Sequence, residues 1–264
     1  IDHQDQDIRA GGHGRLLVEV APWVARDAGG RKRFAVDQSE TAGRDGDSGL
    51  RSWRLWGPMA GKEKPMSIRT EFPHRIFEQE DMGIVMPDGV RLSARVWMPE
   101  DAAAHPVPAV LEYIPYRKRD GTLPRDEMMH PYVAGHGYAC VRVDMRGNGD
   151  SEGLMDDEYS AQEMADAISV IDWLSKQPWC SGSVGMMGKS WGGFNCLQAA
   201  WTGHPALKAG VSVCSTTDRF ADDVHFRGGC LLGENFGWGA VMLSFSSRPA
   251  GPALRPDWRA DWLK

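Results

Sequence analysis

The sequence predicts an α/β fold, with a mostly parallel sheet and helices on both faces. Four short and nearly continuous apolar runs lie at residues 107–116, 138–147, 183–190 and 207–215. Such runs are typical of strands that are buried on both faces, and the segments between them are predicted to be helical. Because strand and helix alternate, we expect the functional residues to gather at the carboxyl ends of the strands.

A β-hairpin is predicted at the start of the folded domain. The stretch MGIVMPDGVRLSARVWMP (82–99) holds two runs of alternating apolar and polar residues on either side of a P-D-G turn. Pro87 presets its backbone dihedral φ and Gly89 accepts a positive φ, so this turn favours a reversal of the chain.

The clearest helix covers residues 161–176. Its apolar residues recur at intervals of three and four, which is the spacing of one helix face. Ser160 and Glu163 have the spacing of a capping box, in which each side chain accepts a hydrogen bond from a backbone N–H at the start of the helix. The apolar positions are Met164, Ile168, Ile171 and Leu174.

Composition and charge narrow the class of protein. The chain has 264 residues, 42% hydrophobic and 25% charged, which is enough for one substantial core. A net charge of -6 offers no basic surface to a phosphate backbone, so no nucleic-acid partner is expected. No run approaches about 18 apolar residues, so no membrane segment is predicted. The oligomeric state stays open.

Residues 1–65 differ from the rest of the chain in composition and in hydrophobic patterning. They hold ten glycines and ten acidic residues with no sustained strand or helix period, which predicts a disordered or non-native leader. The alternative is a targeting arm, which the acidic residues disfavour. We expect the natural start at Met66 and a folded domain over 66–264.

The five cysteines are widely spaced and form no C-x-x-C pair, so reduced and mostly buried thiols are expected. With no secretory segment visible, the expected location is cytoplasmic. The cysteines are Cys140, Cys180, Cys196, Cys214 and Cys230.

Ser190 is the candidate nucleophile. It lies in G-K-S-W-G, a match to G-x-S-x-G, with a predicted strand before it and a predicted helix at 191–202 after it. That context is typical of a nucleophile elbow. Gly188, Gly192 and Gly193 would relieve crowding in the sharp turn. The alternative interpretation is a serine that only caps the helix.

Two groups are candidates for an oxyanion hole. The backbone N–H of Trp191 is unpaired at the start of the helix, where the helix dipole is positive. Tyr116, in the loop after the first buried run, could point its phenol at the same place. The alternative for Tyr116 is an aromatic residue at the rim. The H-G-G-G run that supplies backbone donors in other hydrolases is absent from the sequence.

A base and an acid for Ser190 are hard to find. Only His204 and His225 follow the serine, and His204 is expected at the surface before the next strand. Asp218 and His225 form the one in-chain pair that could serve as acid and base.

The glycine-rich stretch DMRGNGDSEG (144–153) does not support dinucleotide binding. Gly147 and Gly149 are not followed by a glycine at position 152, and no helix is predicted to open there. We expect Asp144 and Arg146 to pair and to shape a loop next to the site.

Five blocks occur in the order of one known family: MPDGVRLSARVWMP, IPYRKRD, VRVDMRGNGDSEG, QPWCSGSVGMMGKSWGG and STTDRFADDVHFRGG. They resemble the Xaa-Pro dipeptidyl-peptidase and cocaine-esterase-like (CocE/NonD) branch of the α/β-hydrolases, from about Asp81 to the end. The resemblance implies a cofactor-independent serine hydrolase that cleaves small esters, amides or short Xaa-Pro peptides through an acyl-enzyme. By position, Ser190 matches the nucleophile, and Tyr116 and the Trp191 amide match the oxyanion hole.

The resemblance also implies a helical lid from about residue 217, with the catalytic acid and histidine only after the lid. We therefore expect that this chain is an N-terminal part of the catalytic domain, that it lacks both residues, and that it is inactive alone. The alternative is a non-catalytic fragment or a ligand-binding relative. No cofactor or metal is expected.

Overall fold

A computed structural model describes residues 17–20, 24–26, 32–34 and 71–263. The contacts divide the chain into two units, one of residues 1–21 with 72–264 and one of residues 22–71. In the smaller unit, the described strands β2 (Val24–Arg26) and β3 (Lys32–Phe34) form an antiparallel pair.

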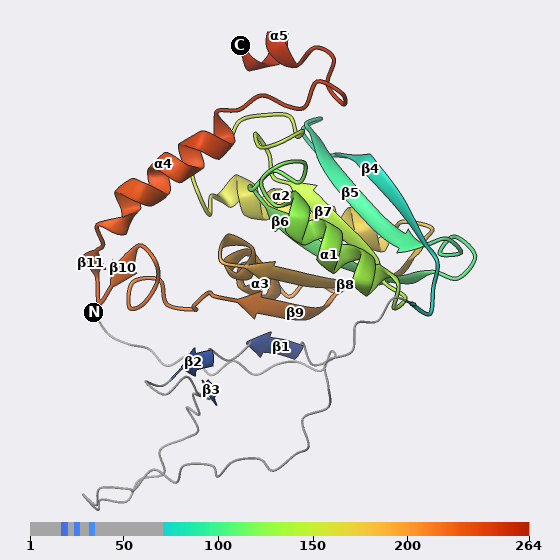
Figure 1. The fold of residues 1–264 in the computed structure, drawn as a ribbon, viewed down its shortest axis with the longest axis horizontal. Helices are drawn as coiled ribbons and strands as arrows, with labels where there is room; N and C mark the ends of the chain where they lie inside the picture. Colours follow the sequence, from blue (N-terminus) through green and yellow to red (C-terminus); the bar gives the residue numbers. More distant parts are fainter. Residues whose placement is uncertain (1–16, 21–23, 27–31, 35–70, 264) are drawn as a thin grey trace, which may run out of the picture. The chain divides into compact units, whose positions relative to one another are not determined.

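The larger unit is built on a seven-stranded sheet in the order β1-β9-β8-β6-β7-β5-β4 (Figure 1). Only the pairs β4–β5 and β5–β7 are antiparallel within it, which confirms the mostly parallel sheet. Its strands are β1 (Leu17–Val20), β4 (Ile76–Val85), β5 (Arg91–Pro99), β6 (Val107–Ile114), β7 (Ala139–Asp144), β8 (Cys180–Lys189) and β9 (Leu207–Val213).

Helices lie on both faces of this sheet. In β6, Ala109 and Leu111 face a large core shared with α2 and α3, whereas Val110 faces a smaller cluster shared with α1. Alternation along one strand therefore separates the two layers, as the period of two requires. The helices are α1 (Leu123–Ala134), α2 (Ala161–Ser175), α3 (Trp191–Trp201), α4 (Glu234–Ser246) and α5 (Trp258–Trp262).

The predicted hairpin and helix cap are both present. β4 and β5 meet at a turn in which Gly89 has a φ of 89° and its N–H donates to Met86 O at 2.9 Å. At the start of α2, the Glu163 N–H donates to Ser160 Oγ at 3.2 Å. The carboxylate of Glu163 accepts from the N–H of Tyr159, one residue before the expected cap position.

The strand β9 pairs with β1 on the side away from β8. The pairing is parallel, with Leu17 opposite Ala209 and Val20 opposite Ser212. The leader therefore has contacts at these four residues. Most of residues 1–65 and the start at Met66 lie outside the described residues.

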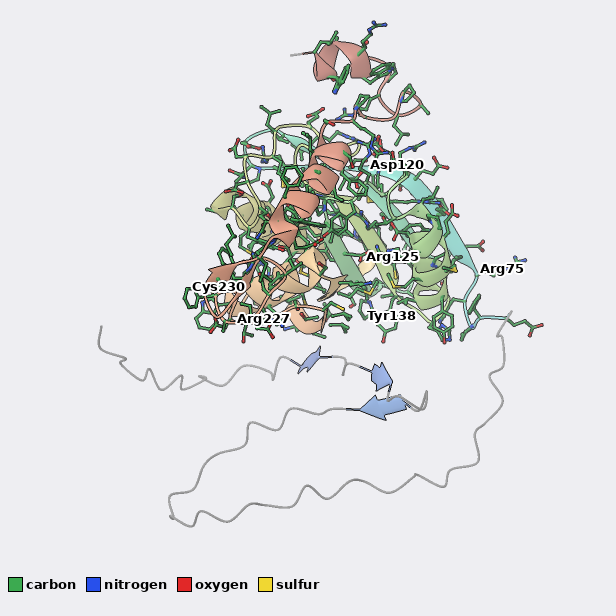
Figure 2. All side chains as sticks on the ribbon, turned by 60° about the vertical axis from the view of Figure 1, so that its left-hand side comes forward. Arg75, Asp120, Arg125, Tyr138, Arg227 and Cys230 are labelled. Carbon is green, nitrogen blue, oxygen red and sulfur yellow. The ribbon has the colours of Figure 1, made fainter. Side chains whose placement is uncertain are left out.

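After β9 the chain runs through turns and two short strands before the helices α4 and α5. A short hairpin of β10 (Phe226–Arg227) and β11 (Cys230–Leu231) precedes α4. Arg227 and Cys230 lie side by side on this hairpin (Figure 2). No described helix is both long and apolar enough to cross a membrane.

Candidate active site

Ser190 lies between the end of β8 and the start of α3. Its φ of 56° and ψ of -118° are the strained values of a sharp strand-to-helix turn. The Ser190 N–H donates to Val213 O of the neighbouring strand at 2.8 Å, and this bond fixes the turn. The hydroxyl oxygen does not cap the helix, which disfavours the alternative interpretation of Ser190 as a helix cap.

The glycines around Ser190 are required by close backbone packing. A Cβ atom on Gly188 would lie 2.3 Å from the carbonyl carbon of Gly192. A Cβ atom on Gly193 would lie 2.8 Å from the carbonyl oxygen of Val213. Real Cβ atoms do not approach backbone so closely, so larger residues would open the turn.

Tyr116 lies beside Ser190. Its phenol hydrogen-bonds the side chain of Ser190, and its oxygen accepts the backbone N–H of Trp191. Burial raises the pKa of Tyr116 to about 12, although these two hydrogen bonds act in the opposite direction. The phenol is therefore protonated at neutral pH and can donate to an oxyanion.

Aromatic rings surround this serine. The ring of Tyr116 is in edge contact with Trp191 and Trp238, at centroid distances of 6.4 and 6.1 Å, and it packs at 5.9 Å against Phe245. Trp238 and Phe245 belong to α4, so the helix after the β10–β11 hairpin supplies one wall of the site. The tryptophan and phenylalanine of α4 were not singled out by the sequence, since no pattern relates α4 to the elbow.

Residues with strained backbone dihedral angles cluster around Ser190. Arg117 adjoins Tyr116, Tyr159 packs at 5.0 Å against Trp191, and Cys214 follows the strand residue that binds the Ser190 N–H. Such strain persists only where the surroundings impose it. In the described chain, the non-glycine residues with a positive φ are Arg117, Tyr159, Ser190 and Cys214.

The Tyr116 loop is clamped to the segment after α4. Arg117 donates from Nη1 to Arg248 O at 3.0 Å and from Nη2 to Pro249 O at 2.8 Å. Its Nε atom lies 3.0 Å from the carboxylate of Asp120, which Figure 2 labels on the loop after β6.

Buried ion pairs and hydrogen bonds also hold the loop that carries Tyr116. Lys118 Nζ lies 2.7 Å from Asp150 Oδ2, and the backbone N–H of Lys118 donates to Asp144 Oδ1 at 2.8 Å. The expected pair of Asp144 with Arg146 is wrong. Arg146 lies beyond the end of β7, where its Nε atom is 2.7 Å from Asp166 of α2.

The structure does not bring Asp218 and His225 together. The exposed carboxylate of Asp218 accepts from the N–H of Ala221 at 3.0 Å. His225 is buried, with Nε2 3.0 Å from Glu158 Oε1 and Nδ1 2.5 Å from Asn235 Oδ1. Neither ring nitrogen is free to take a proton from a serine.

The remaining histidine and cysteines play no part in this geometry. His204 is half-buried in the turn before β9, where Nδ1 accepts from Ala206 N–H at 3.2 Å. All five cysteines are free, and the expectation of burial holds for three of them but not for Cys214 or Cys230, which are exposed.

One group of side chains in the described ranges could in principle hold a metal ion. Ligand atoms of Glu112, Asp126 and His130 lie within 4.8 Å of one another and are buried. However, Arg125 Nη2 lies 2.6 Å from both carboxylates, and Arg142 Nε lies 3.4 Å from Asp126. Two guanidinium groups already balance two carboxylates, so a dication would leave a buried excess of charge. We interpret the group as a structural ion cluster.

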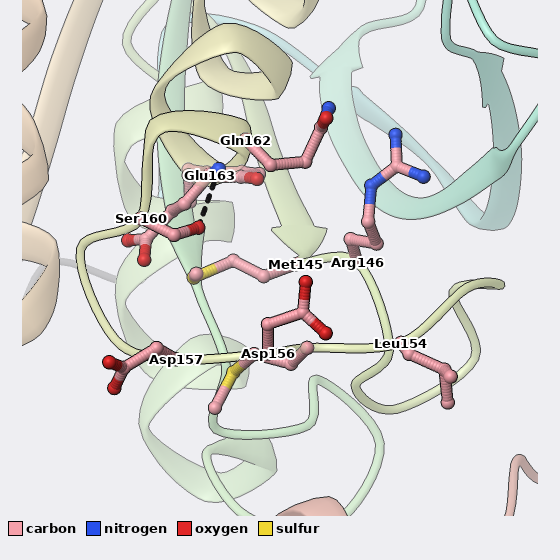
Figure 3. A pocket seen from close by; sticks show the side chains of 10 residues that line it. Met145, Arg146, Leu154, Asp156, Asp157, Ser160, Gln162 and Glu163 are labelled. Carbon is pink, nitrogen blue, oxygen red and sulfur yellow. Dashed lines mark hydrogen bonds between the residues drawn. The ribbon is translucent and has the colours of Figure 1, made fainter.

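Two cavities lie among the described residues, and Ser190 lines neither of them. One of about 30 Å³ lies at the start of α2 and is lined by Met145, Arg146, Ser160 and Glu163 among others (Figure 3). The other, of about 330 Å³, lies between the Tyr116 loop and the segment after α4 and is lined by Arg117, Asp144, Asp150 and Gly251 among others.

Comparison with known proteins agrees with this geometry. The profile of the X-Pro dipeptidyl-peptidase (S15) family matches residues 88–263. The chain belongs to this family. The match covers the hairpin turn, the Tyr116 loop, the Ser190 elbow and the helices after β9, so every element of the candidate site lies inside it.

Individual members and solved structures support the same assignment. The cocaine esterase of Rhodococcus sp. is 36% identical over 188 residues, which are 69% of this chain and 31% of that protein. The structure of an α-amino acid ester hydrolase matches at 28% identity and a TM-score of 0.53, over 72% of this chain and 34% of the other. The α/β-hydrolase fold is thus confirmed.

A CocE/NonD family hydrolase from Staphylococcus aureus shares the fold, with a TM-score of 0.55 and 22% identity over 65% of this chain and 33% of the other. The chain therefore spans only about a third of the length of the S15-family proteins that it matches.

Proposed function

We propose that this chain carries the nucleophile and the oxyanion hole of a serine hydrolase that cleaves ester or amide bonds. The observation that carries the proposal is the place of Tyr116, whose phenol hydrogen-bonds the side chain of Ser190 and accepts the backbone N–H of Trp191, so that both proposed donors lie beside the serine. In acyl transfer, Ser190 Oγ attacks the carbonyl carbon, and the carbonyl oxygen becomes an oxyanion that these donors stabilise.

A base takes the hydroxyl proton of Ser190 and passes it to the leaving alcohol or amine, and water then cleaves the acyl-enzyme to the carboxylic acid and free Ser190.

The proposed substrate class follows from the family and from the lining of the site. Relatives are named for Xaa-Pro peptides, for cocaine and for amino acid esters. The aromatic wall of Tyr116, Trp238 and Phe245 suits an apolar acyl group. We therefore propose small esters, amides or Xaa-Pro peptides as substrates.

The missing partner of Ser190 is a base. Among residues 71–263, none of the hydrogen bonds links Ser190 to a histidine, and His225 bonds Glu158 and Asn235 instead. A serine without a base stays a neutral alcohol. We propose that chain 1–264 alone is essentially inactive, and that the in-chain pair of Asp218 and His225 does not serve.

The alternative function is a relative that binds ligands without catalysis. The test is p-nitrophenyl acetate turnover by chain 1–264 beside its Ser190→Ala variant, together with mass spectrometry after prolonged exposure to a fluorophosphonate. We expect turnover close to that of Ser190→Ala, but slow covalent labelling on the peptide that holds Ser190.

Equal labelling of both proteins would favour the ligand-binding alternative. A stoichiometric burst of p-nitrophenol that needs Ser190 would instead reveal a base within this chain. The matched control is Ser181→Ala, at the start of β8, which leaves the elbow unchanged.

A further inference from the structure

Glu163 connects the start of α2 to the first residue after the nucleophile. The residue is buried at 5% exposure, and its two carboxylate oxygens have different partners. Oε2 accepts from Tyr159 N–H at 2.7 Å, and Oε1 accepts from the indole Nε1–H of Trp191 at 2.7 Å. Figure 3 shows Glu163 above Ser160, and its dashed line marks the hydrogen bond from the backbone N–H of Glu163 to the Ser160 hydroxyl.

Helix capping explains only part of this arrangement. A capping box needs one carboxylate oxygen near the start of its own helix. The second oxygen of Glu163 reaches a different helix, α3, at its first residue. The carboxyl group also hydrogen-bonds the side chain of Asn195, one turn further along α3. Glu163 thus holds α3 at two points.

Trp191 links the carboxylate of Glu163 to the proposed oxyanion hole. Its side chain is 1% exposed and packs against Tyr159 at a centroid distance of 5.0 Å. Its backbone N–H is the donor that bonds Tyr116. Because Trp191 is the first residue of α3, its N–H has no partner inside the helix, and its direction depends on how the residue is held.

We propose that Glu163 is a positioning residue for the oxyanion hole: by fixing the indole of Trp191, it sets the direction of the Trp191 backbone N–H. The inference rests on the proposed function of that amide. It adds a role for a residue that does not touch the substrate.

The negative charge of Glu163 also affects the pKa of Tyr116, which can be measured. Burial raises the pKa of its carboxyl group, while the bonds from Trp191, Asn195 and Tyr159 lower it. The negative charge of Glu163 in turn contributes to the raised pKa of Tyr116. Replacing the carboxylate with a neutral amide should therefore lower the pKa of Tyr116.

The test uses a boronic acid, which forms a tetrahedral adduct with a serine hydroxyl and places an oxygen in the oxyanion hole. Its dissociation constant is measured by calorimetry for chain 1–264 and for Glu163→Gln, Trp191→Phe and the double variant. We expect each single variant to weaken binding about tenfold, less than the 10²–10³ loss in rate for a deleted donor. The double variant should bind the boronic acid no more weakly than either single variant, because both substitutions remove the same hydrogen bond, between Glu163 and Trp191.

Ser160→Ala is the matched control. It removes the hydroxyl that accepts the Glu163 N–H and so weakens the same helix cap, but it leaves the bond to Trp191. It should lower the melting temperature without changing boronate affinity or the pKa of Tyr116. If Ser160→Ala weakens boronate binding as much as Glu163→Gln does, Glu163 acts only through the fold and the proposal is overturned.

The outcomes also separate this proposal from the proposed function. If boronate binding depends on Ser190 but is unchanged by Glu163→Gln, the oxyanion hole stands and the role of Glu163 is overturned. If wild type and Ser190→Ala bind the boronic acid equally, the proposed function is wrong, and the positioning role is overturned with it.

Discussion

The Nε2 atom of His225 lies 3.0 Å from Oε1 of Glu158, and its Nδ1 atom bonds the side chain of Asn235 at the start of α4. Among the described residues after Ser190, His225 is the buried histidine, and it joins the loop before α2 to the helix that forms the aromatic wall. We infer a structural role for it rather than that of a base.

The first prediction concerns this link. His225→Ala should leave slow fluorophosphonate labelling of Ser190 intact and lower the free energy of unfolding by roughly 1–3 kcal/mol, because Asn235 and Glu158 lose a buried partner. Urea denaturation and labelling measure the two effects. Asp218→Asn is the control and should change neither, and a loss of labelling in His225→Ala would instead make His225 the base.

The second prediction concerns the elbow. Gly188→Ala should destabilise the protein by about 1–3 kcal/mol or more, since its Cβ atom would meet the backbone of Gly192 at 2.3 Å. Gly239→Ala is the control, because that glycine lies inside α4 with open space around it. It should stabilise the helix by about 0.5–1 kcal/mol. Equal denaturation midpoints for the two variants would contradict the packing.

The third prediction concerns the titration of Tyr116. The phenol has a pKa of about 12 in the folded chain, above the model-peptide value of about 10. The stability that comes from keeping it protonated is fully present below pH 10 and is lost as the pH rises toward 12. Tyr116→Phe should remove this part of the alkaline loss.

Ultraviolet absorbance of the phenolate in wild type and Tyr116→Phe measures the pKa directly. A difference spectrum with a midpoint near pH 10 would mean that the phenol is not buried against Ser190.

The fourth prediction concerns the strand before the folded domain. Backbone amides of Leu17–Val20 should exchange more slowly than those of an unpaired chain, because these residues pair with β9. Hydrogen exchange with mass spectrometry is the measurement, and Val18→Pro should remove the protection. Exchange of this segment within the dead time would restore the expectation of a leader without contacts.

Much of the fold could be predicted because its signals are local. The alternation of apolar runs and amphipathic spacers, the P-D-G turn and the capping pair of Ser160 and Glu163 each depend on residues that are neighbours in sequence. The nucleophile elbow is also local, since its glycines must lie two residues to either side of Ser190. These expectations agree with the structure.

Errors arose where partners lie far apart in the chain. Asp144 was expected to pair with Arg146, two residues away, but the tertiary fold supplies Lys118 to one and Asp166 to the other. The strand β9 likewise pairs with β1, from the start of the chain, which no local pattern indicated.

Residue type and local spacing were enough to indicate the α/β layers and to single out Ser190 as the proposed nucleophile, with Tyr116 and Trp191 as proposed donors. Only tertiary packing determines which partner each charged side chain contacts. It places Glu158 beside His225, brings Glu163 to the indole of Trp191 and packs α4 against Tyr116. The physical reason is that hydrophobic periodicity acts over a few residues, whereas ion pairs and ring contacts depend on distances that only tertiary packing sets.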